Sequence, residues 1–91
     1  MRDRQVSAQQ HRTQRNEKNI HTFILKLQQS GYTEGIYRSP YRIFKKDNIT
    51  VEVSLSLNEV LFIQDGTTDK YSSNNIPLAH AHLLTLLLNS H

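Results

Sequence analysis

The chain contains no cysteine and no tryptophan, and its 91 residues include only three glycines and two prolines. Without cysteine it can form neither disulfide bonds nor thiolate nucleophiles nor cysteine zinc sites, a composition that fits a reducing compartment. No apolar run approaches the roughly 18 residues that a membrane span requires. No apolar segment marks a secretory signal near the N-terminus either, so we expect a cytoplasmic protein that makes no membrane contact.

Apolar residues and net charge divide unevenly near residue 19. The first 19 residues contain only Met1, Val6 and Ala8 as apolar residues, and the whole formal charge of +3 lies in this segment because the cations and anions that follow it balance. We therefore expect a basic polar N-terminal arm, residues 1–19, that begins the first helix. Residues 20–91 are expected to form a single small α+β domain.

The first helix is predicted to run without interruption over residues 6–30. Ser7 and Gln10 fit a capping box at its start, and Gly31 supplies a stop. Its C-terminal half carries a core-facing stripe: Ile20, Phe23, Ile24 and Leu27. The N-terminal half lacks such a stripe, so it either projects into solvent, frays or lies on a partner.

Alternating apolar and polar residues then predict strands. The alternation is clearest from Ile49 to Leu57, where it indicates a half-buried antiparallel strand with Glu52 on the exposed polar face. We expect further strands at residues 41–46 and 60–64 and a short one at residues 67–71. Pro40 should confine the first strand to the edge of the sheet, because proline cannot donate to the ladder.

Short polar sequences between these strands predict turns. Asp47-Asn48 fits a tight turn, and Asp65-Gly66 is a strong signal for a two-residue type I′ hairpin turn. The strands should therefore form a meander, in which each strand pairs with the next.

A second helix is predicted over residues 76–89, with Asn75 as its cap and Pro77 in its first turn. Its apolar residues cover about twice the arc that one packing face needs. Either the rest of the domain buries the helix from both sides, or the helix also makes a subunit contact. We favour the contact and expect a homo-oligomer. The expected interface residues are Leu83, Leu86, Leu87 and Leu88.

The predicted fold is α+β: a helix, a three- or four-stranded antiparallel meander and a helix, with both helices on one face of the sheet. This order is similar to that of the double-stranded-RNA-binding domain and of the small mRNA-cleaving toxins. The chain departs from both at their motifs. It has Asn74-Asn75-Ile76-Pro77 where the first family places lysines and Arg38-Ser39-Pro40 where the toxins carry Gly-Ser-His, so the motifs assign it to neither family.

No constellation predicts catalysis, and we expect neither an enzyme nor a cofactor. His80 and His82 are two positions apart, which turns them to different sides of a helix and prevents them from sharing a metal ion. His80 falls in the apolar arc and is expected to be a buried histidine, with a pH switch as the alternative. His82 is expected on the polar strip.

Basic residues provide the remaining signal. Cations lie on one side of the first helix, and aromatic residues alternate with cations near the first strand, a mixture suited to phosphate contact and base stacking. A charged, solvent-facing helix surface and a protected sheet edge are the alternative interpretation. The candidate nucleic-acid-binding residues are His11, Arg12, Arg15, Lys18, Lys26, Arg38, Arg42, Lys45 and Lys46.

Two functional hypotheses follow. In the first, the protein is a small non-catalytic binding module that contacts nucleic acid or a nucleoprotein complex through the basic helix face and the edge strand. In the second, it is an oligomeric protein-binding regulator, such as an inhibitor, immunity factor, antitoxin or adaptor, that acts through its leucine-rich C-terminal helix.

Overall fold

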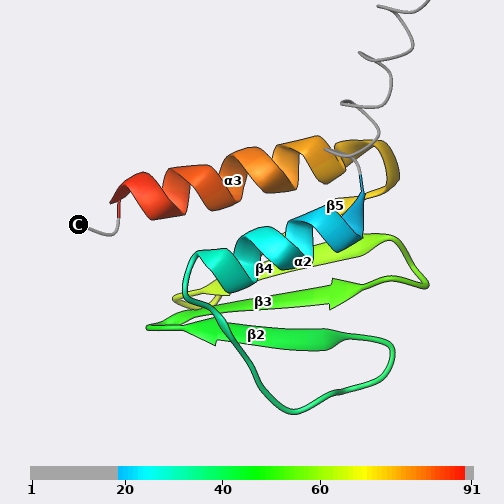
Figure 1. Cartoon of the computed structure of the whole chain (residues 1–91), viewed down its shortest axis with the longest axis horizontal. Coiled ribbons are helices and arrows are strands. Elements are labelled where there is room, and N and C mark those ends of the chain that lie inside the picture. The colour runs from blue at the N-terminus through cyan, green and yellow to red at the C-terminus, as the bar shows by residue number, and fades with distance from the viewer. Residues whose placement is uncertain (1–18, 90–91) are drawn as a thin grey trace, which may run out of the picture.

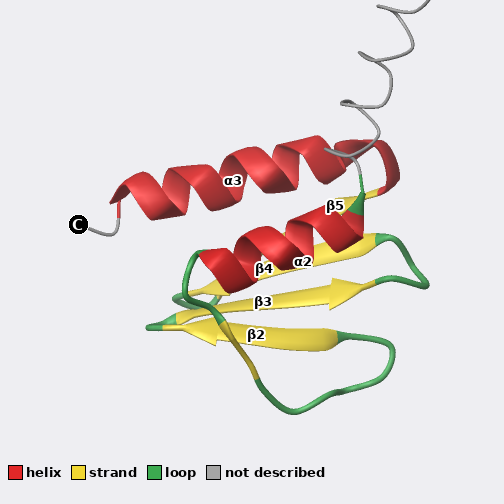
Figure 2. Cartoon of the chain, viewed as in Figure 1, coloured by secondary structure: helices red, strands yellow, loops and turns green. Residues whose placement is uncertain are grey.

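A computed structural model of the chain describes residues 19–89. Two helices lie side by side on one face of a five-stranded antiparallel sheet (Figures 1 and 2). The strands are ordered β1-β2-β3-β4-β5, so each pairs with its sequence neighbour. The elements are α2 (Ile20–Gln29), β1 (Thr33–Glu34), β2 (Arg42–Lys46), β3 (Ile49–Ser54), β4 (Glu59–Gln64), β5 (Thr67–Ser72), the 3-10 helix η1 (Ser73–Asn75) and α3 (Ile76–Asn89). The predicted α+β class is confirmed, but the meander has five strands rather than three or four.

Helix α2 begins at an asparagine cap. Asn19 has extended backbone angles (φ −83°, ψ 127°), and its side chain accepts a hydrogen bond of 2.7 Å from the backbone N–H of His21. An asparagine at this position satisfies one of the unpaired donors of the first turn. The prediction of one uninterrupted helix is therefore wrong at Asn19, whereas the expected residues 6–18 of that helix lie outside the described residues.

The end of α2 follows the prediction. Gly31 has a φ of +92°, a left-handed conformation that glycine adopts without a steric penalty. The N–H of Gly31 donates to the carbonyl of Gln28, and the N–H of Tyr32 donates to that of Leu27. This pair of bonds is a Schellman motif, which satisfies the last carbonyls of the helix and turns the chain toward the sheet.

The core lies between the helices and the sheet. All four residues of the predicted α2 stripe are buried there. On the sheet, the alternate residues that face the helices are buried as well, and Phe44, Val51 and Phe62 lie next to one another on β2, β3 and β4. Phe23 of α2 meets Phe62 edge to face, with ring centroids 5.9 Å apart. Burial of this apolar face is the main force that holds the helices on the sheet.

Both predicted hairpin turns are present. Lys46 pairs with Ile49 and Gln64 with Thr67, so each turn contains two residues. Asp65 and Gly66 both have positive φ (52° and 78°), as a type I′ turn requires.

Strand β3 ends earlier than predicted. It stops at Ser54, and Leu55 and Leu57 lie in the following turn with 42% and 49% of their surfaces exposed. The Oγ of Ser54, which is fully buried, accepts a 3.1 Å hydrogen bond from the N–H of Leu57 and thereby stabilises the turn. The alternation of apolar and polar residues in the sequence extends past the end of the strand. A serine that stabilises a turn has the same polarity as a serine on an exposed strand face, so the two cannot be told apart by this pattern.

Two expectations about the sheet are also wrong: the edge position of the strand after Pro40 and the exposure of Glu52. Strand β2 lies inside the sheet, because β1 pairs with it through Thr33↔Lys45 and Glu34↔Phe44. A two-residue strand is too short to show a period in the sequence. Pro40 lies in the loop before β2 and leaves the ladder intact. Glu52, expected on an exposed face, is only 6% exposed, and Arg38 from this same loop contacts its carboxylate.

Helix α3 has the predicted bounds, but the residue before it does not have the predicted role. Asn75 is the last residue of a 3-10 turn that continues into α3, so it does not act as the predicted cap. Ile76, Ala79, His80 and Leu83 form the buried side of the helix. Within residues 19–89, neither helix combines the length and the apolar character needed to cross a bilayer.

Candidate functional site

One flank of α3, beside its buried side, presents an apolar stripe to solvent. Leu84 is 57% exposed and Leu88 66% exposed, and Ala81 is exposed beside them. The half-buried Pro77 precedes them, and the four residues follow one another along the chain at spacings of four, three and four. Such spacings place residues on one side of a helix. We call Pro77, Ala81, Leu84 and Leu88 the outer stripe. The whole helix contains no Asp, Glu, Lys or Arg.

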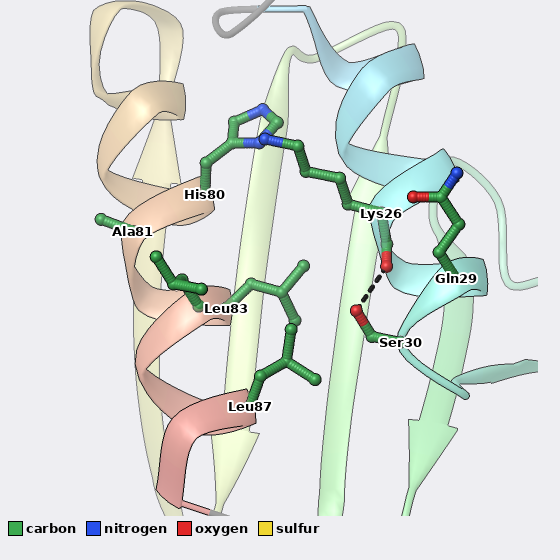
Figure 3. A pocket seen from close by; sticks show the side chains of 8 residues that line it. Lys26, Gln29, Ser30, His80, Ala81, Leu83 and Leu87 are labelled. Atoms are coloured by element: carbon green, nitrogen blue, oxygen red, sulfur yellow. Dashed lines mark hydrogen bonds between the residues drawn. The ribbon is translucent and has the colours of Figure 1, made fainter.

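A groove of about 350 Å³ adjoins the outer stripe between α2 and α3 (Figure 3). Its α2 wall is polar and its α3 wall is mostly apolar. The side chain of Lys26 extends across the groove toward the ring of His80 (Figure 3). The lining residues are Lys26, Gln29, Ser30, His80, Ala81, Leu83, Leu84 and Leu87. The groove extends the apolar surface from the outer stripe toward α2.

The predicted interface leucines occupy three different environments. Leu83 is 2% exposed and belongs to the core. Leu86 is half-buried and packs against the core, and Leu87 is half-buried in the wall of the groove. Of the four, Leu88 alone is exposed. Sequence reasoning missed Leu84, and a helical wheel could not have identified it, because Leu84 lies only about 40° around the helix from the buried His80.

His80 has the predicted buried position. It is 8% exposed, and its ring meets Phe23 edge to face with the centroids 5.2 Å apart. This contact joins α3 to α2. Aromatic pairs in this geometry are favourable because the positive edge of one ring meets the negative face of the other.

His82 was expected on a polar strip but is half-buried against the sheet. Its ring stacks on Phe62 of β4, with centroids 4.1 Å apart and planes 23° apart. The Nδ1 of His82 also lies 2.9 Å from the hydroxyl oxygen of Tyr71 on β5. Burial, followed by the charge of Asp69, raises the pKa of Tyr71 and favours the neutral phenol at this contact. These contacts attach α3 to the last two strands.

Two of the predicted nucleic-acid-binding cations attach β2 to neighbouring elements. Arg42 donates two 2.8 Å hydrogen bonds to the carboxylate of Glu34, and these bonds lower the pKa of Glu34. Lys46 donates a 2.8 Å hydrogen bond to the carbonyl of Ser30 at the end of α2, and its ammonium lies 5.8 Å from the centre of the Tyr32 ring. Both cations hold β2 to its surroundings.

The other predicted cations of the described residues lie on opposite sides of the molecule. Lys26 is on the helix side, whereas Arg38 and Lys45 line a groove of about 650 Å³ on the face of the sheet that turns away from the helices. Arg38 is 2.6 Å from a carboxylate oxygen of Glu52 in the same groove. The remaining candidates, His11, Arg12, Arg15 and Lys18, lie outside the described residues. The described cations therefore form no single basic surface.

We call this second hollow the open-face groove. The residues that form it come from the loop after β1 and from β2, β3 and β4. The lining comprises Gly35, Ile36, Tyr37, Arg38, Ile43, Lys45, Thr50, Glu52 and Ile63. Arg38 and Lys45 were among the cations predicted from the sequence; the loop after β1 brings Arg38 and Tyr37 to the hollow, and β2 contributes Lys45.

In the part of the chain that the structure describes, His, Asp and Glu side chains nowhere gather in a group of three that could hold a metal ion. Comparison with protein-family models, with curated proteins and with solved structures finds no match to this chain.

Proposed function

We propose that the protein is a non-catalytic, self-associating binding module whose working surface is the outer stripe of α3. The observation that supports this proposal most directly is the exposure of Leu84 and Leu88 on one side of a helix that contains no Asp, Glu, Lys or Arg. Scattered apolar residues are normal on a protein surface, but a contiguous apolar patch commonly marks an interaction site. Leucine side chains bind a partner without reacting with it, so the proposed role is binding rather than catalysis.

A second copy of the chain suits this surface. The outer stripe can pair with itself when two α3 helices meet antiparallel about a two-fold axis between Ala81 and Leu84. Leu84 of one copy then faces Ala81 of the other, and Leu88 faces Pro77. Each large side chain thus meets a smaller one, and α3 contains no Asp, Glu, Lys or Arg that would bring like charges together.

The basic N-terminal arm is a poorer occupant. The outer stripe calls for apolar side chains, whereas residues 1–19 hold few of these and carry the net positive charge of the protein. Burial of unpaired cations against leucines would be costly. A different apolar protein partner would leave the purified chain monomeric, so the oligomeric state separates that alternative from the proposal.

The experiment is a mass measurement by light scattering and sedimentation over a wide range of protein concentration. We expect the wild type to form dimers, and Leu84→Glu and Leu88→Glu to remain monomers with an unchanged circular dichroism spectrum. Leu78→Glu is the matched control, because Leu78 is 56% exposed on the same helix but lies about 120° around it from Leu84. A wild type that stays monomeric throughout, or a Leu78→Glu variant that dissociates as readily as Leu84→Glu, would contradict the proposal.

A further inference from the structure

The open-face groove lies on the opposite side of the sheet from α3, so self-association through the outer stripe leaves it accessible. Its floor is formed by Ile43 and Ile63, two half-buried residues of β2 and β4. The loop after β1 adds Ile36 and Tyr37, which are 86% and 60% exposed. A solvent-facing aromatic ring beside an apolar floor offers a surface on which a flat, apolar group can stack.

The accessible charge of this groove is positive. The Glu52 side chain is only 8% exposed and is bound by Arg38, so its negative charge is both covered and neutralised. The Arg38 side chain remains 65% exposed, and Lys45 is exposed at the same groove. A ligand that enters from solvent therefore meets cations before it meets the carboxylate.

The next acidic side chain on this face is also occupied. Glu59 accepts a 2.9 Å hydrogen bond from the hydroxyl of Tyr41, and its other carboxylate oxygen lies 3.5 Å from the ammonium of Lys70. Its side chain is 17% exposed. The acids on the open face of the sheet are thus covered and paired, which leaves an anionic ligand without strong repulsion.

We propose that the open-face groove binds single-stranded nucleic acid. One base stacks on Tyr37 over the apolar floor, and the adjoining phosphates contact Lys45 and Arg38. This ligand combines the two properties that the groove selects, a flat aromatic group and a negative charge next to it. A duplex hides the faces of its bases inside the stack and cannot make the Tyr37 contact, so single strands are the preferred form.

This site keeps Arg38 and Lys45 of the candidate residues predicted from the sequence and leaves out the basic helix face. The basic helix face includes Lys26, which lies on the helix side of the molecule, whereas Tyr37, Arg38 and Lys45 lie on the open face. The two sites can therefore be separated by changing one lysine in each. Both lysines are exposed, so either substitution should leave the fold intact.

The experiment measures binding of the full chain to a fluorescent oligothymidylate and to a duplex of the same length by anisotropy. Wild-type protein should bind the single strand more tightly than the duplex. Tyr37→Ala should weaken single-strand binding by roughly ten- to a hundredfold, the effect typical of a lost base–aromatic stack. Lys45→Gln should weaken it as well and lower the slope of log K against log salt by about 0.7, the value expected for one phosphate contact on a single strand.

Lys26→Gln is the matched control and should bind as the wild type does. Loss of binding in Lys26→Gln with retention in Lys45→Gln would place the contact on the helix side and overturn the proposal. Equal affinity for duplex, or no binding at low salt, would overturn it too. So would binding of a small aromatic carboxylate, such as benzoate, at the groove without binding of the oligonucleotide. Leu84→Glu should bind the single strand even as a monomer, so failure of self-association and failure of this groove give different results.

Discussion

The hydroxyl oxygen of Tyr71 lies 2.9 Å from Nδ1 of His82 and so joins the last strand of the sheet to the helix that follows it. The His82 ring also stacks on Phe62, so three aromatic side chains from β4, β5 and α3 form one cluster. The cluster therefore fixes how α3 presents Leu84 and Leu88.

Tyr71→Phe is predicted to destabilise the fold while leaving its architecture intact. The substitution keeps the ring and removes the hydroxyl, so the half-buried nitrogen of His82 loses a hydrogen-bond partner. We expect a loss of about 1 kcal/mol in the free energy of unfolding. For a domain of this size that loss corresponds to a fall of about 4–8 °C in Tm. Thermal unfolding of Tyr71→Phe and of the control Tyr37→Phe, which alters an exposed tyrosine, tests this expectation; equal Tm values would refute it.

The pairing of Arg42 with Glu34 predicts a loss of stability in acid. Two hydrogen bonds from Arg42 lower the pKa of Glu34 below its ordinary value of 4.5. A carboxyl group with a lowered pKa in the folded state stabilises the fold above its unfolded pKa, and this contribution disappears as pH falls through the folded value. Because both side chains are about one third exposed, we expect the effect to be modest.

Urea unfolding of the wild type and Glu34→Gln, at neutral pH and at steps below pH 4.5, measures this contribution. The wild type should be the more stable at neutral pH, and the difference between the two proteins should shrink as the pH falls. A difference that stays constant across the acid range would show that Glu34 titrates normally in the folded protein.

Ser54→Ala is predicted to loosen the turn between β3 and β4. The buried Oγ of Ser54 accepts the N–H of Leu57, and alanine would leave that donor without its partner. Loss of such a partner costs about 1–3 kcal/mol. Ser56→Ala is the control, because Ser56 is exposed in the same turn and contacts only the Ser54 hydroxyl at 3.3 Å. Chemical unfolding should separate the two variants, and comparable losses would argue against the role given to Ser54.

The elements that could be predicted from the sequence are those with a repeated pattern. The stripe on α2, the alternation from Ile49 to Val53 and the Asp65-Gly66 turn each depend on neighbouring residues, so local spacing was sufficient to identify them. Asn19 shows the limit of this approach, because an asparagine can lie inside a helix or begin one. The choice depends on the backbone of that residue, which the spacing of apolar residues does not report.

The candidate sites depend on contacts between distant residues, which spacing cannot supply. Glu52 alternates as an exposed strand residue should, yet its side chain is only 8% exposed and pairs with Arg38, which lies 14 residues earlier in the chain. The wide apolar surface of α3 was recognised, but a helical wheel alone does not say which leucines the sheet covers. Arg42 and Lys46 likewise had the charge expected of phosphate ligands, yet Glu34 and the end of α2 engage them.

Two adjacent leucines of α3 give the sharpest contrast between core and surface. Leu83 is 2% exposed and Leu84 is 57% exposed. Leu83→Ala should destabilise the fold by about 2–5 kcal/mol, because it removes buried methyl groups and leaves a cavity. Leu84→Ala should change the free energy of unfolding by no more than about 0.5 kcal/mol when the protein is dilute and monomeric.

The same pair should behave in the opposite way in assembly. At high protein concentration Leu84→Ala should weaken self-association, because it removes the side chain proposed to face Ala81 of the second copy. Folded Leu83→Ala should self-associate as the wild type does. Unfolding at low concentration and sedimentation at high concentration measure the two properties separately. If Leu84→Ala were as destabilising as Leu83→Ala in the dilute monomer, the outer stripe would belong to the core of the fold and could not serve as its binding surface.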